Sequence, residues 1–223
     1  MPAIELYEMQ GSAPCRAVRL TARALGKPLT VHHLDLMAGE HLKPEFVKIN
    51  PQHTIPTIVD DGFALWESRT IMRYLVNKYS KGSSLYPEEP KARALVDQRL
   101  DFDLGTLYAK YAVYFYPQVF GTAPENAEDL KKLNEALAHL NTFLGESKYA
   151  AGSNLTIADF SLVATISTID VSDIVDLKQY PNICKWYEHL QSSVEGYEEE
   201  NLAGLENFRS FIKEFKAKKA AAK

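Results

Sequence analysis

The chain has 223 residues, of which 46% are hydrophobic and 24% charged, and its formal net charge is −4. These values are ordinary for a globular protein, and the mild acidity argues against a nucleic-acid partner, because phosphate binding needs clustered Lys and Arg. Two cysteines are too few for a disulfide framework, and no apolar run reaches the ~20 residues that span a bilayer. Because the N-terminus also lacks the basic and long apolar regions of a signal peptide, we expect a cytoplasmic location and no membrane partner.

The first 80 residues alternate between strand and helix patterns. In chain order they predict a strand at 3–7, a helix at 17–25 that Gly26 and Pro28 end, a strand at 29–34, a hairpin with strands at 57–59 and 63–65, and an amphipathic helix reaching Tyr79. A crossover between parallel strands followed by an antiparallel hairpin implies a small mixed sheet with helices packed on it. The fold class of this part is therefore α/β, with the order βαβ-ββα.

Strand patterns fade after a linker at 81–90, which is rich in Gly, Ser and Pro. From residue 91 to residue 223 the pattern is all-helical, with amphipathic segments at 91–116, 126–146, 157–171 and 182–193 that Pro117, Pro124, Gly152 and Pro181 separate. We therefore expect two domains, 1–80 and 91–223, the second a helical bundle.

A capping box marks the start of the helix at 157–171. Thr156 stands at the N-cap and Asp159 at the third helical position, so each side chain can satisfy a backbone N–H that the helix leaves open. The residues that follow are apolar on nearly every side, which predicts the buried centre of the bundle. We expect Thr156 and Asp159 to have structural roles.

Two short motifs in the first half predict a ligand site. Pro56 cannot donate a ladder hydrogen bond and belongs at a strand edge, where a cis Ile55-Pro56 bond would leave Ile55 free to pair with an extended peptide. The segment at 50–58 contains this bond. Nine residues after Ile58, Glu67 and Ser68 open a helix, where they can bind an ammonium and a carboxylate. Glutathione, an extended tripeptide with two carboxylates and one ammonium, fits this combination.

Ser12 stands just before the first helix. Its hydroxyl can donate to a sulfur anion, and the helix N-terminus adds a favourable dipole and open N–H groups. Ser12 could also be a plain N-cap. Tyr7, near the end of the first strand, and Cys15, on the first helical turn, are alternative reactive groups; for Cys15 a small buried hydrophobic role is favoured.

These motifs together resemble one known family. Ser12-Ala-Pro-Cys-Arg16, the segments at 36–46 and 50–57, Glu67-Ser-Arg69 and the helical second half are similar to cytosolic glutathione transferases, with the insect delta and epsilon classes most alike. The resemblance covers essentially the whole chain. It implies a thioredoxin-like N-terminal domain, Ser12 as the catalytic hydroxyl in preference to Tyr7, and a homodimer with one site per subunit.

The resemblance also distributes the remaining roles. Glutathione binding is expected of His41, His53, Thr54, Ile55, Pro56, Glu67, Ser68 and Arg69. The two histidines suit the glycyl carboxylate, although each could be a solvent-exposed loop residue, and Arg69 could reach or orient the γ-glutamyl carboxylate. Asp103 is assigned a supporting ion pair by resemblance alone.

An apolar pocket for the second substrate is expected where aromatic residues gather, near 107–120. The residues proposed to line it are Ala13, Pro14, Leu36, Tyr108, Tyr111, Tyr116, Phe120 and Phe208. Phe211 could close the pocket or dock the tail. The Lys-rich end at 213–223 is expected to be a solvated helix end and not a nucleic-acid arm.

The expected activity is transfer of glutathione, as its thiolate, to hydrophobic electrophiles, with reduction of organic peroxides as a side activity. A non-catalytic carrier of hydrophobic ligands, or a glutathione-dependent isomerase or dehalogenase, would use the same fold. Glutathione would be a co-substrate; no permanent cofactor and no metal are expected.

Overall fold

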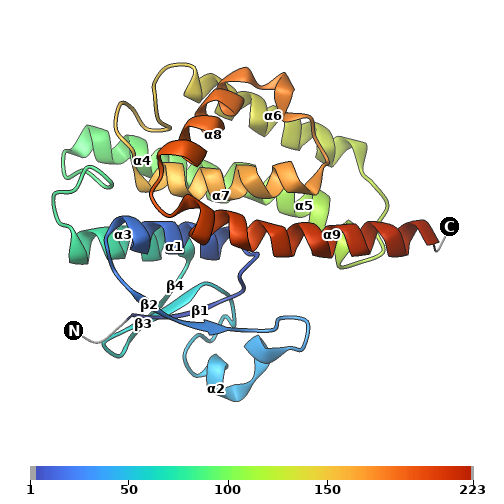
Figure 1. Ribbon diagram of the computed structural model, residues 1–223, viewed down its shortest axis with the longest axis horizontal. Helices are drawn as coiled ribbons and strands as arrows, with labels where there is room; N and C mark the ends of the chain where they lie inside the picture. The colour runs from blue at the N-terminus through green and yellow to red at the C-terminus, as the bar shows by residue number, and fades with distance from the viewer. Residues whose placement is uncertain (1–3, 222–223) are drawn as a thin grey trace.

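The computed structural model describes residues 4–221, and its N-terminal part is built on a four-stranded sheet (Figure 1). The elements of this part are, in chain order, β1 (Ile4–Glu8), α1 (Ala13–Ala24), β2 (Leu29–His33), the short helices η1 (Glu40–Leu42) and α2 (Pro44–Val47), β3 (Thr57–Asp60), β4 (Phe63–Trp66) and α3 (Ser68–Tyr79). The predicted order βαβ-ββα is confirmed. The short helices η1 and α2 lie in a stretch that the sequence patterns left as loop, because pieces of three and four residues are too short to show a periodicity.

The sheet has the strand order β2-β1-β3-β4. Strand β1 is parallel to β2, pairing Leu6 with Val31, and antiparallel to β3, pairing Leu6 with Ile58. Leu6 and Ile58 are completely buried, and burying such a side chain contributes about 1.5–3 kcal/mol. The sheet is therefore mixed, as the sequence predicts, with its two central strands carrying its core.

The turn of the β3–β4 hairpin needs two left-handed residues in succession. Asp61 has φ +53° and Gly62 has φ +79°. A two-residue type I′ turn requires positive φ at both positions, and Asp-Gly is among the pairs that supply it at least cost. The hairpin follows directly from the sequence.

The C-terminal part is helical throughout the residues that the structure describes. Its elements are α4 (Pro90–Phe102), a π-helical turn η2 (Asp103–Leu107), α5 (Tyr108–Val119), α6 (Ala127–Leu144), α7 (Ile157–Ser172), η3 (Leu177–Gln179), α8 (Pro181–Ser193), a second π-helical turn η4 (Glu198–Leu202) and α9 (Ala203–Ala221). Residues 222–223 of the Lys-rich end, like residues 1–3, lie outside the described part. No helix of the described chain is long and apolar enough to cross a membrane.

Pro117 does not end its helix, contrary to the sequence prediction. Helix α5 continues through Pro117 to Val119. The proline lies in the last turn, so it removes one backbone bond and little helix remains beyond it. The side-chain amide of Gln118 donates to the carbonyl of Tyr114 at 2.6 Å, which supplies that carbonyl with a further bond.

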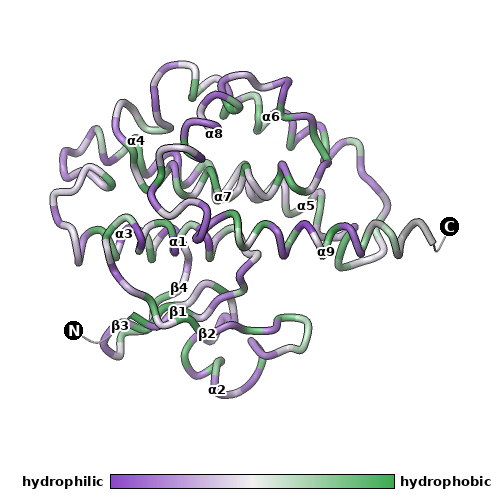
Figure 2. Tube along the Cα trace, in the orientation of Figure 1, coloured by the Kyte–Doolittle hydropathy of each residue, from purple (hydrophilic) through white to green (hydrophobic). Residues whose placement is uncertain are grey.

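Helix α7 is the centre of the bundle, as predicted, and its apolar character is visible in Figure 2. Both halves of the capping box are formed at its start. The Asp159 carboxylate accepts from the backbone N–H and the hydroxyl of Thr156, each at 3.0 Å, from the Ala150 N–H at 2.8 Å and from the Trp186 indole at 2.9 Å. This completely buried carboxylate therefore joins the helix start to two other segments of the bundle.

The two parts meet through α1, which packs on α3 on one side and on α7 on the other. In Figure 1, α1 and α3 lie between the sheet and the helical bundle, whereas α2 lies beyond the sheet. The start of α1 therefore lies where the sheet and the bundle meet.

Candidate active site

Ser12 is the N-cap of α1, and its side chain makes no capping hydrogen bond to the helix. Its backbone N–H donates to the Met9 carbonyl at 2.9 Å, which fixes the turn from β1 into α1. The hydroxyl is partly exposed and faces a cavity. The Ser12 side chain interacts with the buried Cys15 thiol, and because it does not cap its own helix, its hydroxyl can turn to a ligand at the positive end of the helix dipole.

Neither alternative reactive group is placed like Ser12. The Tyr7 hydroxyl donates to Glu5 at 3.2 Å, and its ring stacks on His32 with the centroids 4.7 Å apart. Cys15 is completely buried, and this burial raises the pKa of its thiol to about 12. A thiol in that environment stays protonated and packs as a small apolar side chain.

A buried asparagine shapes the loop that follows α2. The Asn50 amide donates to the Thr54 carbonyl at 3.0 Å and to the Thr57 hydroxyl at 2.9 Å, and its oxygen accepts from the Gln52 N–H at 2.9 Å. The Ile55-Pro56 bond is cis, as the sequence predicts. Asn50 thus holds the loop from within, and the outward-facing residues of the loop are left for a ligand.

A cavity of about 420 Å³ separates Ser12 from this loop. From the N-terminal part it is lined by Met9, Gly11, Ser12, Ala13, Pro14, Leu36, His41, His53, Thr54 and Ile55, and from the helical part by Tyr108, Tyr116, Phe120, Thr168 and Phe208. The His41 and His53 rings are 6.0 Å apart. The structure therefore brings most of the proposed glutathione and pocket residues around one space.

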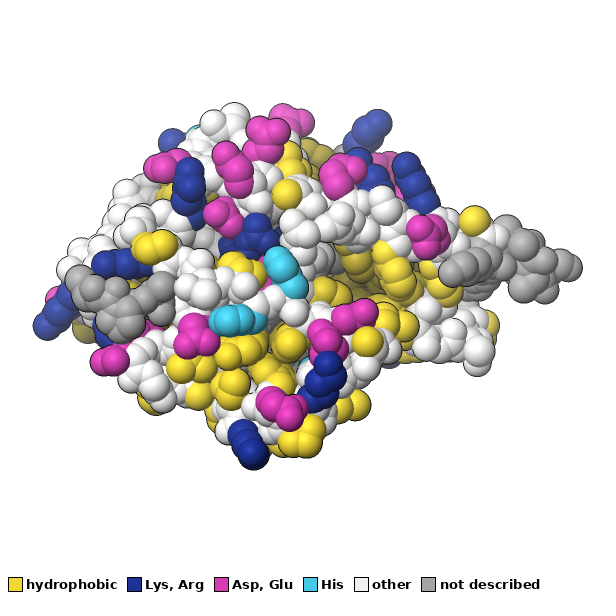
Figure 3. All heavy atoms as spheres, turned by 60° about the horizontal axis from the view of Figure 1, so that its bottom comes forward, with side chains coloured by type: hydrophobic (Ala, Val, Ile, Leu, Met, Phe, Trp, Pro, Cys, Tyr) yellow, Lys and Arg dark blue, Asp and Glu magenta, His cyan; other side chains and the backbone are white. Residues whose placement is uncertain are grey.

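A second cavity of about 460 Å³ adjoins the first and shares Met9, Gly11, Leu36, His41, Phe120 and Phe208 with it. Its further lining residues are Gln10, Met37, Asn207 and Phe211. Phe211 stacks on Phe120 with the ring centroids 5.7 Å apart. Figure 3 shows apolar side chains gathered on this face beneath α9, with histidine side chains close by.

Tyr108 and Tyr116 supply the polar groups on the helical wall. Their hydroxyl oxygens are 2.8 Å apart, and burial raises the pKa of Tyr108 well above its ordinary value. Both phenols are therefore neutral near pH 7; one hydroxyl donates to the other, and the second proton of the pair is left to donate to a polar group in the pocket.

Tyr111 differs from the prediction that it lines the pocket. It is completely buried, and its hydroxyl oxygen is 2.8 Å from that of Ser172, in the interior of the bundle. A separation of three positions along the helix from Tyr108 does not suffice to bring both rings to the cavity. The lining residue that the sequence analysis missed on this side is Thr168, a polar residue in the otherwise apolar α7.

Glu67, Ser68 and Arg69 begin α3, but they are not equally available. Glu67 is exposed and adopts φ +68°, a strained conformation for a residue with a side chain. Ser68 and Arg69 are buried; Arg69 forms an ion pair with Asp103 and donates to the Ser68 hydroxyl oxygen at 2.9 Å. The Ser161 hydroxyl also donates to Asp103. Arg69 is therefore bound to Asp103 of the helical part and to Ser68, and its role toward a ligand carboxylate stays a prediction.

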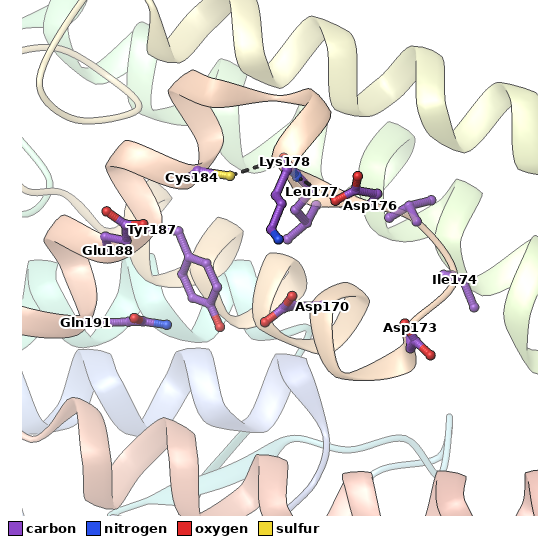
Figure 4. A pocket seen from close by; sticks show the side chains of 11 residues that line it. Asp170, Asp173, Ile174, Asp176, Leu177, Lys178, Cys184, Tyr187, Glu188 and Gln191 are labelled. Carbon is purple, nitrogen blue, oxygen red and sulfur yellow. Dashed lines mark hydrogen bonds between the residues drawn. The ribbon is translucent and has the colours of Figure 1, made fainter.

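A further cavity, of about 720 Å³, lies away from Ser12, between the end of α7 and α8 (Figure 4). Asp170, Asp176 and Glu188 line it, and its cysteine, Cys184, is bonded to the Leu177 carbonyl at 3.1 Å. This negative environment disfavours a thiolate. In the described chain no three metal-ligating side chains come together, there or elsewhere.

The chain belongs to the glutathione S-transferase family. The family model for the N-terminal domain matches residues 6–85 and the model for the C-terminal domain matches residues 104–193. The N-terminal domain is accordingly thioredoxin-like, and the C-terminal domain is helical.

Solved insect transferases share nearly the whole structure. A delta-class glutathione transferase of Nilaparvata lugens is 48% identical with a TM-score of 0.92, covering 95% of this chain and 99% of that one. A glutathione transferase of Bombyx mori is 46% identical (TM-score 0.90; 95% and 98% covered). An epsilon-class glutathione S-transferase of the housefly, Musca domestica, is 38% identical (TM-score 0.89; 95% and 98% covered). The predicted resemblance to these two classes is confirmed.

Proposed function

We propose that this glutathione transferase ionises glutathione at Ser12 and transfers the thiolate to hydrophobic electrophiles held against α5 and α9. The observation that carries this proposal is the Ser12 hydroxyl, free of any helix-capping bond, at the mouth of a cavity lined by both domains. Family membership supports the reaction class, and the delta- and epsilon-class relatives support the choice of serine.

The thiolate is the reactive form of glutathione, and a free thiol has a pKa of about 8.5. Lowering that pKa by two units requires about 2.7 kcal/mol of preference for the anion. One charge-assisted hydrogen bond from Ser12, with the dipole and open N–H groups of α1, supplies a stabilisation of about 2–3 kcal/mol. Ser12 acts as a donor and forms no covalent intermediate.

The tripeptide is held by two groups of residues. His41 and His53 bind the glycyl carboxylate, while Thr54, Ile55 and Pro56 present an extended edge to the peptide backbone of the ligand. Glu67 binds the ammonium. The Ser68 hydroxyl accepts its hydrogen bond from Arg69, so its own proton is left to donate to the γ-glutamyl carboxylate.

The second substrate occupies the apolar space beside the sulfur. Ala13, Pro14, Leu36, Tyr108, Tyr116, Phe120 and Phe208 line this space, and none of these side chains carries a charge. Tyr108 and Tyr116 are placed to donate to an oxygen or a leaving group of the electrophile. The same thiolate would reduce an organic peroxide, whereas an isomerase or dehalogenase would differ only in this pocket. A carrier role is not favoured, since carrying a hydrophobic ligand does not require a glutathione site.

Replacing Ser12 tests the assignment. In Ser12→Ala we expect kcat/KM for glutathione and a generic aryl halide to fall at least about tenfold near pH 7, and the loss to shrink at alkaline pH, where the thiol ionises without help. Retention on a glutathione resin and thermal stability should persist. Ser153→Ala, an exposed serine in a loop, is the matched control. Full activity of Ser12→Ala would refute the role of Ser12.

Several further properties are part of the proposal. The protein acts in the cytoplasm as a homodimer with one site per subunit, and glutathione is a co-substrate with no permanently bound cofactor. The domains extend over 1–80 and 91–223, with 81–90 as linker. Sedimentation and gel filtration at several protein concentrations test the dimer directly.

A further inference from the structure

Arg16 is a completely buried cation in α1 whose hydrogen-bond partners are all neutral. One guanidinium nitrogen donates to the Ser167 hydroxyl at 3.0 Å and to the side-chain oxygen of Asn201. Another donates to the Ala164 carbonyl at 3.0 Å and to the Thr168 hydroxyl. The third nitrogen, Nε, has no partner. Buried charges are normally paired with an opposite charge, so this environment is unusual.

The titratable groups that face Arg16 do not supply a negative charge. They are Cys15, Tyr111, Tyr116, Tyr187 and Tyr197, and burial raises the pKa of each, so that all five are neutral near pH 7. Burial lowers the pKa of Arg16 only to about 10, so the guanidinium stays charged. Within residues 4–221, Arg16 therefore forms no ion pair.

Arg19, one helical turn after Arg16, is paired with carboxylates. Arg19 pairs with Glu200 at 2.8 Å and with Glu8 at 3.5 Å, and Glu8 also contacts His33 at 3.2 Å. Arg23, the third arginine of α1, contacts Glu195 at 3.6 Å, so among the arginines of this helix Arg16 alone lacks a counter-ion within the described residues.

The position of Arg16 relates this charge to the active site. Its backbone N–H donates to the Ser12 carbonyl at 3.0 Å, so it lies one helical turn from the candidate catalytic hydroxyl. The first turn of α1 holds no acidic residue. Thr168, which accepts from the guanidinium, also lines the cavity that Ser12 faces. A cation near a helix N-terminus opposes the dipole and is disfavoured unless an anion binds there.

We propose that Arg16 is an electrostatic positioning residue whose buried charge stabilises the glutathione thiolate at Ser12, and that this thiolate is the counter-ion that the fold omits. The inference rests on the proposed role of Ser12. Unit charges about 10 Å apart attract strongly enough to move a pKa by about one unit at an effective dielectric constant of about 20. The positive charge acts through Thr168 and the start of α1 without touching the substrate.

The most direct test keeps Arg16 and places a negative charge beside its guanidinium. Asn201→Asp keeps the shape of the side chain and puts a carboxylate on the atom that already accepts from Arg16. We expect the pKa of the bound glutathione thiol, followed by the ultraviolet absorbance of the thiolate, to rise by roughly one unit. Asn134→Asp is the matched control, since Asn134 also accepts a side-chain hydrogen bond, from Tyr180 at 2.9 Å, but lies on α6 away from the site. It should leave the thiol pKa unchanged.

A second measurement separates charge from damage to the fold. Asn201→Asp should weaken glutathione binding at pH values where the thiol is ionised, yet leave the Kd of S-methylglutathione, whose sulfur is neutral, unchanged. Equal weakening of both ligands, or a folded Asn201→Asp protein with an unchanged thiol pKa, would overturn the proposal. Should Asn201→Asp not fold, Arg16→Lys replaces it: retention of the low thiol pKa supports the role of the charge, and its loss contradicts it.

A failure of the proposed role of Ser12 can be distinguished from a failure of the proposed role of Arg16. If the unmodified protein bound glutathione without lowering its thiol pKa, the role of Ser12 itself would fall, before any variant was compared.

Discussion

Asp159 shows how one buried residue can stabilise a helix start and its surroundings together. Its carboxylate accepts from Thr156, Ala150 and Trp186, so it satisfies donors from three segments at once. Because each buried donor left without a partner costs about 1–3 kcal/mol, we expect Asp159→Ala to lower the free energy of unfolding by at least about 3 kcal/mol. Thr156→Ala should lower it by about 1 kcal/mol.

Urea denaturation measures both effects, and glutathione affinity of the folded fraction should remain unchanged. Ser153→Ala, nearby in the preceding loop, serves as the control. Normal stability of the Thr156→Ala protein would contradict the structural assignment of the capping box.

The sequence predicts the roles of site residues that depend on local motifs, but not those of residues whose partners are distant in the chain. Ser12 stands at a helix start, His41 in the short helix η1 and His53 in a loop, and all three line the cavity. The role of Arg69 depends instead on Asp103, which is 34 residues away in the chain and becomes its partner only through folding. Arg16 ends the motif that begins at Ser12, but the motif does not show that its charge is buried among neutral groups, since these partners come from α7 and η4.

At the scale of elements, Asp60 ties the β3–β4 hairpin to α3. Its carboxylate accepts from Lys78 at 2.8 Å, from Tyr79 at 2.8 Å and from Tyr74 at 2.9 Å. Burial alone would raise the pKa of Asp60, but these hydrogen bonds outweigh burial and the net pKa is lowered. The hairpin therefore gains stability whenever Asp60 is ionised.

The sign of the pH dependence follows from that lowered pKa. The contribution of Asp60 to the free energy of unfolding is complete above the pKa that this residue has in the unfolded chain, about 4. It is lost as the pH falls through the lower pKa of the folded state. We expect the Tm of Asp60→Asn to lie well below that of the unmodified protein at pH 7, and the difference to shrink steadily in acid. A difference that stays constant from neutral to acidic pH would show that the charge of Asp60 is not responsible.

Element boundaries were predictable where a local signal is strong and unpredictable where tertiary contacts decide. The Asp61-Gly62 turn and the Thr156 cap follow from local chemistry, and both occur where the sequence predicts them. Pro117 was expected to end a helix, yet packing of α5 against α6 carries the helix two residues further. A proline in the last turn removes too little hydrogen bonding to prevent this.

At the scale of the whole molecule, the ion pair between Arg69 and Asp103 joins the N-terminal domain to the helical domain. Both side chains are buried, so removing one charge leaves the other uncompensated, which typically costs about 3–5 kcal/mol. We expect Asp103→Asn to lower the free energy of unfolding by an amount near this range. It should also weaken glutathione binding, because Arg69, which donates to the Ser68 hydroxyl oxygen, then loses its charged partner.

Asp101→Asn is the matched control for Asp103→Asn. Asp101 lies two residues earlier, pairs with Arg73 at 3.1 Å, and has a side chain that is 70% exposed. Its replacement should change stability by less than about 1 kcal/mol. Equal effects of the two variants in calorimetric unfolding would argue against a special contribution of the buried pair.

The close approach of α9 to the loop before Ser12 depends on Gly204. A Cβ atom at this position would lie 2.2 Å from the Gln10 carbonyl oxygen and 2.9 Å from the Arg16 side chain. The first turn of α9 therefore contacts the backbone at Gln10, two residues before Ser12. Phe208 and Phe211, one and two turns later, line the apolar cavity. A side chain larger than hydrogen at position 204 would therefore displace either α9 or the turn that carries Ser12, and with α9 the Phe208 side chain that lines the same cavity.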